Sequence, residues 1–166
     1  MIRSYAIFCE NNQTEKEYPF GTTLAEIAAD QKVDLGFPIL GAMVNNSLKE
    51  LTYMVYKPKT VNFIGFPHAD GQRMYLRSLS MILFKASRDL YPNHKLKVQH
   101  SVSGGLYCEL VNHESPGPLE EIVERLQHRI KEIIALDIPF DRDEIRTDEA
   151  LKIFEQFNLE DKCTLM

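Results

Sequence analysis

The spacing of apolar side chains predicts a first unit built from short strands. Residues 2–8 mix β-branched and aromatic side chains as a strand does, and residues 15–18 follow a turn-forming Asn-Asn-Gln-Thr as the hairpin partner. Residues 42–44 predict another strand, which leads into a tight turn at Asn45-Asn46. Residues 60–66 alternate enough to form a further strand. The first part of the chain is therefore expected to be rich in antiparallel pairs.

One helix is expected between these strands, and its start is well marked. Thr23 has the side chain of an N-cap, and Glu26 stands three residues later, which is the pattern of a capping box. Leu24, Ile27 and Ala28 then fall on one face of the helix. This order of strands and helix predicts a small mixed sheet crossed by one helix.

Residues 65–72 are rich in turn-forming residues and mark the expected boundary between a unit at 1–66 and a unit at 67–166. The second unit is predicted to contain, in order, a helix over 77–92, strands over 95–102 and 104–110, a long helix over 118–136 and a last helix capped by Thr147. Helices and strands occur in both units, so the expected fold class is α+β.

The composition is that of an ordinary globular protein, with 44% hydrophobic and 26% charged residues among 166. We do not expect the first residues to form a signal peptide, and no apolar run approaches the roughly 20 residues of a membrane span. The three cysteines are far apart and lack a CxxC spacing, which favours free thiols in a reducing compartment. We expect a cytoplasmic protein without a membrane partner.

Charge is segregated along the chain. Counted from the sequence, residues 1–70 carry a net charge of -2, residues 71–110 carry +4 and residues 111–166 carry -7. The helix expected over 77–92 therefore lies in the only basic segment of an acidic protein.

This helix has one apolar and one mixed face when its residues are placed at 100° intervals. The expected core face holds Tyr75, Leu76, Leu79, Ile82, Leu83, Ala86 and Leu90. The opposite arc holds Arg73, Arg77, Lys85 and Arg88 together with Met74, Met81 and Phe84. This mixture favours a surface that binds a phosphate-bearing partner, either RNA or a nucleotide, or another domain. The alternative is a solvated helix whose apolar members tuck under neighbouring loops.

Two patterns suggest a small-molecule or metal site but lack the required residues. Gly36 and Gly41 have the spacing of a phosphate-binding loop, but the residues that follow are alanine and methionine where lysine and serine or threonine are needed, so this stretch is expected to be a turn. The five histidines show no HxxxH or HExxH spacing. His100 and Cys108 could meet across neighbouring strands, which is a weak zinc signal, so no metal site is assigned.

Two other patterns are also expected to have neither a catalytic nor a lipid-attachment role. Ser101 and Ser103 stand beside His100, but no acidic partner for a catalytic triad is indicated. Residues 163–166 match a prenylation signal only formally, because Thr164 is not aliphatic and the preceding segment is acidic. We expect that no catalytic residue and no cofactor site lie in this segment.

The first unit resembles the TGS domain, a β-grasp module found in threonyl-tRNA synthetases and some GTPases. The run Ala-x-Val-Asn-x-x-Leu-x-x-Leu at 42–51 carries most of the likeness. The second unit resembles the domain that follows TGS in threonyl-tRNA synthetases, whose helix usually reads His-x-x-x-His-Leu-Leu-x-x-Ala and whose histidines belong to an editing site that hydrolyses mischarged tRNA. Arg77 and Met81 stand in the places of those histidines, and neither replaces a neutral imidazole.

Together the two likenesses resemble most closely the amino-terminal half of bacterial uridine kinase-like nucleoside kinases. This resemblance implies a non-catalytic binding or regulatory region, a kinase domain after residue 166 as its partner, ATP and Mg²⁺ as the cofactors of the whole transferase, and a second copy of the chain as a further partner. The alternative is an RNA-binding module of a threonyl-tRNA synthetase-like protein without editing activity. A working editing hydrolase is disfavoured by Arg77 and Met81.

Overall fold

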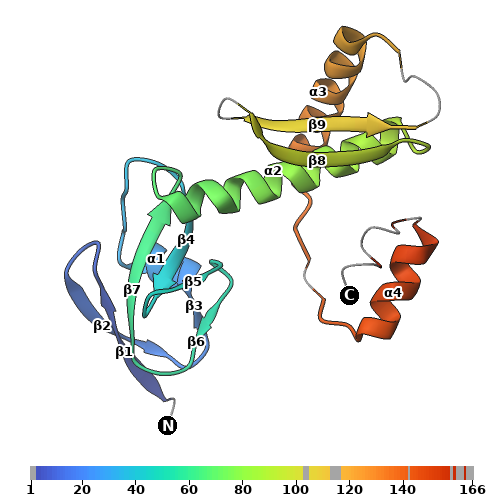
Figure 1. Cartoon of the computed structure of the whole chain (residues 1–166). Helices are drawn as coiled ribbons and strands as arrows, with labels where there is room; N and C mark the ends of the chain where they lie inside the picture. Colours follow the sequence, from blue (N-terminus) through green and yellow to red (C-terminus); the bar gives the residue numbers. More distant parts are fainter. Residues whose placement is uncertain are drawn as a thin grey trace. The chain divides into compact units, whose positions relative to one another are not determined.

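The computed structural model describes residues 3–102, 105–112, 117–141, 143–157, 159 and 163 (Figure 1). The elements are β1 (Ser4–Cys9), β2 (Thr14–Pro19), β3 (Thr22–Thr23), α1 (Leu24–Asp30), β4 (Ile39–Val44), β5 (Ser47–Lys49), β6 (Met54–Val55), β7 (Lys59–Gly65), α2 (Ala69–Leu90), β8 (Lys95–Val102), β9 (Gly105–Val111), α3 (Leu119–Ala135) and α4 (Thr147–Gln156). The expected mixture of helices and strands, an α+β fold, is confirmed.

The chain divides into two compact units, Met1–Lys131 and Glu132–Met166. The first contains all three sheets that the structure describes, and the second contains α4 with an exposed apolar segment before it. The division expected after residue 66 stays a prediction. Among the described helices, none combines the length and the apolar character needed to cross a bilayer.

A five-stranded mixed sheet with the order β2-β1-β7-β4-β5 forms the first part of the chain. β1 pairs antiparallel with β2 and parallel with β7, so β7 lies between the first strand and β4. The expected hairpin of β1 and β2 and the strand at 60–66 are confirmed. Asn45 and Asn46 both have positive φ, as a two-residue hairpin turn requires.

Helix α1 begins where the sequence indicates. The Thr23 side chain accepts a hydrogen bond from the Glu26 amide, and the Glu26 carboxylate accepts one from the Thr23 amide, so both bonds of the capping box are present. Its buried side chains pack on one face of the sheet, and the core cluster consists of Ile7, Cys9, Tyr18, Leu24, Ile27, Ala28, Ala42, Val44, Val55, Val61 and Phe63. Because strand side chains alternate, Ala6 and Phe8 point to the opposite face.

A polar contact joins the end of α1 to β2. Asp30 accepts hydrogen bonds from Lys16 Nζ and from the Tyr18 hydroxyl, both at 2.7 Å. The Lys16 and Tyr18 hydrogen bonds hold the pKa of Asp30 below its ordinary value. Burial, with a contribution from Asp30, raises the pKa of Tyr18 to about 12.

This contact predicts losses of stability at both ends of the pH range. A lowered carboxyl pKa stabilises the fold above the unfolded value near 3.9 and is lost as the pH falls below it. A raised tyrosine pKa stabilises below about 10 and is lost as the pH rises toward 12. A phenolate absorbance titration should show one tyrosine ionising near 12. In Asp30→Asn this pKa should fall but stay raised, because burial is its main cause; a pKa that does not change would contradict the contact.

Helix α2 begins at Ala69, inside the stretch at 65–72 that was expected to be a boundary turn, so this stretch is partly helical. His68 is the N-cap, and its Nδ1 accepts a hydrogen bond from the Asp70 amide. Gly71 permits this start because its Cα lies against the Gly65 carbonyl, where a Cβ would come within 1.9 Å of the oxygen. In α4, Arg146 is the N-cap instead of the expected Thr147.

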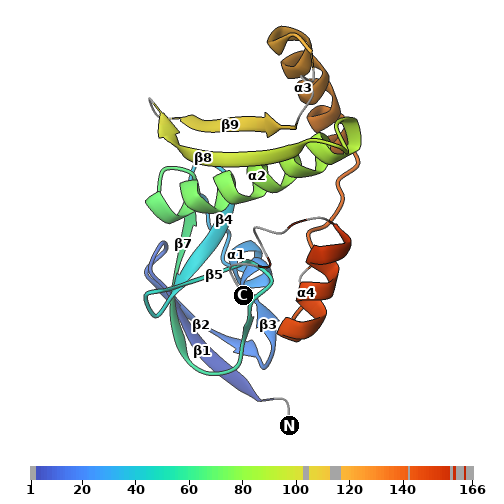
Figure 2. The same ribbon diagram turned by 45° about the vertical axis from the view of Figure 1, so that its right-hand side comes forward.

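Strands β8 and β9 form the expected antiparallel hairpin, which runs beside α2 (Figure 2). The long helix α3 confirms the helix expected over 118–136, with bounds at Leu119 and Ala135. An ion pair between Arg129 of α3 and Asp89 of α2, at 2.7 Å, joins these two helices.

Candidate functional site

The four expected binding cations all lie on α2, but their side chains have different partners. Arg73 Nη1 lies 2.7 Å from Asp70 Oδ1, and Lys85 Nζ lies 2.6 Å from Asp89 Oδ1. The Arg88 guanidinium lies 5.9 Å from the centre of the Phe84 ring. Arg77 makes no ion pair or hydrogen bond with its side chain in the part of the chain that the structure describes. Its guanidinium is therefore available to an external anion.

The three apolar side chains on the mixed face of α2 have different surroundings. Met74 packs on β4, where a Cβ on Gly41 would come within 2.9 Å of the Met74 methyl group. Phe84 lies under Arg88. Met81 is 59% exposed, so the expectation that neighbouring loops cover all three side chains does not hold for it.

The expected core face of α2 is only partly buried, and that prediction is wrong for its first turns. Ala86 is fully buried, but Tyr75 is 48% exposed, Leu76 is 43% exposed and Leu79 is 38% exposed. Tyr75 contacts the ring of Phe66 edge-on, and Phe66 is itself half exposed. The helix meets the sheet through its first turn and the hairpin through its later turns, and an amphipathic pattern does not tell which turns are covered.

Near the end of α2, the structure brings together cations from two helices. Asp89 accepts hydrogen bonds from Lys85 Nζ and from Arg129 Nε and Nη2 of α3. The Lys85 and Arg129 hydrogen bonds hold the pKa of Asp89 below its ordinary value. Arg125, one turn before Arg129, places its guanidinium 5.5 Å from the centre of the buried Tyr91 ring.

Arg125 and Arg129 were missed by the sequence argument because they lie in the most acidic segment of the chain. A net charge over a segment averages all faces of a helix. The signal that could have found them is their spacing of four residues, which places like charges on one face of α3.

No metal site is found among the residues that the structure describes. They contain no group of three histidine, cysteine or acidic side chains able to hold a metal ion. Cys108 pairs with Val98 across the hairpin, whereas His100 stacks on Tyr107 at 6.3 Å. Ser103 and His113 lie outside the described residues, and so do the side chain of Ser101 and residues 164–166 of the formal prenylation signal.

The glycine-spaced stretch at 36–41 is a turn followed by a strand. Gly36 has a φ of 73° and donates its amide to the Asp34 side chain. Gly41 lies inside β4. A phosphate-binding loop leads instead into a helix N-terminus, so this stretch has the wrong local structure as well as the wrong residues.

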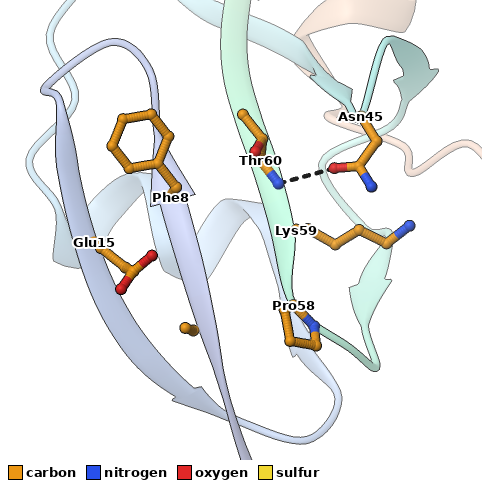
Figure 3. A pocket seen from close by; sticks show the side chains of 7 residues that line it. Phe8, Glu15, Asn45, Pro58, Lys59 and Thr60 are labelled. Atoms are coloured by element: carbon orange, nitrogen blue, oxygen red, sulfur yellow. Dashed lines mark hydrogen bonds between the residues drawn. The ribbon is translucent and has the colours of Figure 1, made fainter.

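The open face of the five-stranded sheet carries a shallow hollow of about 270 Å³ (Figure 3). It is lined by Ala6, Phe8, Glu15, Asn45, Pro58, Lys59 and Thr60. Asn45 Oδ1 accepts a hydrogen bond from the Thr60 amide at 2.9 Å, which fixes one rim. Glu15 and Lys59 form no ion pair with any described residue. The hollow offers polar groups, but it does not contain a paired acid and base for catalysis.

Comparison with known proteins gives a consistent set of relatives, although no family model matches the chain. The chain is 31% identical over 147 residues to the threonine–tRNA ligase of Clostridium kluyveri, which is 89% of this chain and 23% of that protein. It is 30% identical over 143 residues to the enzyme of the same name from Acetivibrio thermocellus, covering 86% of this chain and 22% of the relative. The threonine–tRNA ligase of Desulforamulus reducens is 28% identical over 141 residues, which is 85% of this chain and 22% of that protein.

These relatives overturn the expected kinase parent. The similarity extends over most of the chain, and it is to threonine–tRNA ligases. The expected function as a kinase regulatory region is therefore wrong, and so are the expected ATP-binding transferase activity and the carboxyl-terminal kinase domain as partner. Arg77 and Met81 in place of the two histidines bear on the editing chemistry and do not indicate which domain the rest of the protein contains. The chain is similar to threonine–tRNA ligases over nearly its whole length and spans less than a quarter of theirs.

Proposed function

We propose that this chain is an RNA-binding module of a threonyl-tRNA synthetase-like protein and that it has no editing activity. The observation that carries the proposal is the 31% identity to a threonine–tRNA ligase over 89% of the chain. A protein with that name acts on tRNA, and the described surface of α2 offers cations to a phosphate backbone. We place this function in the cytoplasm.

The proposal also assigns a fold to each of two parts of the chain. Residues 1–66 would form a TGS-like β-grasp domain, and residues 67–166 a second α+β domain like the one that follows TGS in threonyl-tRNA synthetases. The mixed sheet crossed by α1 supports the first assignment. The long α2 followed by the hairpin of β8 and β9 supports the second.

The module is proposed to bind without hydrolysis because two side chains are unsuited to the chemistry. Arg77 and Met81 occupy the helix positions where the resemblance expects histidines, and both are exposed. A guanidinium stays protonated near neutral pH and a thioether has no proton to exchange, so neither can act as a general base. Release of the amino acid from a mischarged tRNA by the purified chain would contradict this part of the proposal.

Charge reversal on α2 is expected to weaken RNA binding strongly. Arg77→Glu together with Arg88→Glu places two negative charges on a surface that would face phosphates, so the affinity should fall at least about tenfold. Fluorescence anisotropy with a labelled RNA hairpin carrying a single-stranded 3′ tail measures this change. The affinity of the unaltered chain should also fall steeply as salt increases.

A matched control is available in Lys57, which is exposed and forms no ion pair in the described structure. Lys57→Glu changes the net charge by the same amount as Arg77→Glu but leaves α2 intact. Equal losses in these two single variants would show a nonspecific charge effect and contradict the site. RNA binding by the variant with both Arg77→Glu and Arg88→Glu that is as tight as binding by the unaltered chain would also contradict the site.

A further inference from the structure

We infer that the end of α2 holds a buried water molecule, with the Ser87 and Tyr91 hydroxyl groups as its two side-chain ligands. The inference does not depend on the proposed RNA-binding function. It concerns how two polar groups are satisfied where α3 is joined to α2 by the ion pair between Arg129 and Asp89.

The first argument is that both hydroxyl groups are buried without a hydrogen bond to protein. Ser87 is 1% exposed and Tyr91 is 6% exposed. Neither Ser87 Oγ nor Tyr91 Oη has a hydrogen-bond partner among the residues that the structure describes. A buried hydroxyl group without any partner destabilises a folded protein. Nearly all buried polar groups are therefore bonded either to protein or to ordered water.

The second argument is the spacing of the two residues. Ser87 and Tyr91 are four residues apart, and side chains at this spacing lie on the same side of a helix. The Tyr91 amide donates a hydrogen bond to the Ser87 carbonyl at 2.7 Å, so the helical turn continues as far as Tyr91. A single water molecule that donates to one hydroxyl group and accepts from the other would satisfy both of them.

The third argument is that Ser87 lacks a bond that another serine of the same helix makes. Ser80 Oγ donates a hydrogen bond to the Leu76 carbonyl, four residues earlier, at 2.8 Å. The corresponding acceptor for Ser87 is the Leu83 carbonyl, and Ser87 Oγ does not bond to it. The hydroxyl group of Ser87 is therefore available to another partner.

The side chains around Tyr91 contact its ring and leave its hydroxyl group without a partner. The Arg125 guanidinium of α3 lies 5.5 Å from the centre of the ring, and the His94 ring meets it edge-on at 5.9 Å. Both side chains carry N–H groups, but neither is bonded to Tyr91 Oη. The low exposure of Ser87 and Tyr91 favours water over a larger ligand.

A crystal structure of the full chain that resolves ordered water tests the site directly. We expect one water molecule within about 3.2 Å of both Ser87 Oγ and Tyr91 Oη. A structure without a water molecule that contacts both oxygens would overturn the inference.

The sign of a change in thermal stability provides a second test. Tyr91→Phe keeps the ring beside Arg125 and removes only the hydroxyl group. Because this group is bonded to water, we expect the melting temperature to fall by about 2 to 4 °C. Tyr75→Phe removes a hydroxyl group from a half-exposed ring of the same helix and should leave the melting temperature unchanged. A higher melting temperature of Tyr91→Phe would show a hydroxyl group buried without a partner and would overturn the site.

The two hydroxyl groups should also depend on each other if they share one water molecule. Ser87→Ala should lower the melting temperature relative to Ser78→Ala, which measures the helix propensity of alanine at an exposed serine of α2. In the variant with both Ser87→Ala and Tyr91→Phe, the combined loss should be smaller than the sum of the two single losses, because the first change already removes one ligand of the water. Fully additive losses would contradict a shared water molecule.

Discussion

Replacing Gly71 with alanine is expected to destabilise the protein by about 3 kcal/mol or more. The same change inside an ordinary helix stabilises it by up to about 1 kcal/mol. The sign of the change in stability therefore shows whether Gly71 meets the backbone of β7. The reason is that a Cβ at this position would stand 1.9 Å from the Gly65 carbonyl oxygen and 2.7 Å from its carbon. These are backbone atoms at the end of β7, and they cannot rotate away as a side chain can. Urea unfolding of the variant measures the loss.

Gly36 provides the control for this prediction. It has a φ of 73° and no atom within 4 Å of where its Cβ would stand, so Gly36→Ala should cost only the strain of a left-handed backbone, about 1 kcal/mol. A smaller loss in Gly71→Ala than in Gly36→Ala would mean that α2 does not start against β7 as described.

The second large effect is expected at Asn11, in the turn between β1 and β2. Its side chain accepts a hydrogen bond from the Phe63 amide at 2.7 Å and donates one to the Phe63 carbonyl at 3.0 Å. Phe63 is almost completely buried, so Asn11→Ala leaves two backbone groups of β7 without these partners. The expected loss in the free energy of unfolding is about 2 to 3 kcal/mol.

Two further variants make the Asn11 prediction specific. Asn11→Asp can still accept from the Phe63 amide but has no proton for the carbonyl, so it should not restore full stability. Asn12→Ala removes an exposed hydrogen bond to the Gln31 carbonyl and should cost about 1 kcal/mol or less. If the two alanine variants were equally stable, Asn11 would not be an essential link between β1 and β7.

Local signals in the sequence predicted the elements of the fold well. Thr23 and Glu26 mark the start of α1 because both capping bonds are made within one turn. Asn45 and Asn46 mark a hairpin because few other residues tolerate positive φ at two successive positions. In each case the decisive interaction lies within four residues, so it is readable without the tertiary structure.

The features that the sequence did not predict depend on contacts between distant segments. The early start of α2 depends on Gly71 meeting Gly65, and the turn-forming composition of 65–72 pointed to a loop instead. The exposure of Leu76 and Leu79 depends on which neighbours reach α2. The pairing of Arg129 with Asp89 spans forty residues, so this link between α3 and α2 could not be seen from charge counts along the chain.

The position of β7 has a consequence for synthesis of the chain. The hairpins of β1 with β2 and of β4 with β5 are formed by near neighbours, but they belong to one sheet only through β7, which pairs with both β1 and β4. A ribosome therefore releases two separate hairpins with unpaired edges before Lys59–Gly65 emerges. Open edges of this kind pair readily with other chains. Translation that stalls before β7 has emerged should thus yield aggregation-prone fragments, whereas a stall after Gly65 has left the ribosome leaves a sheet that can close.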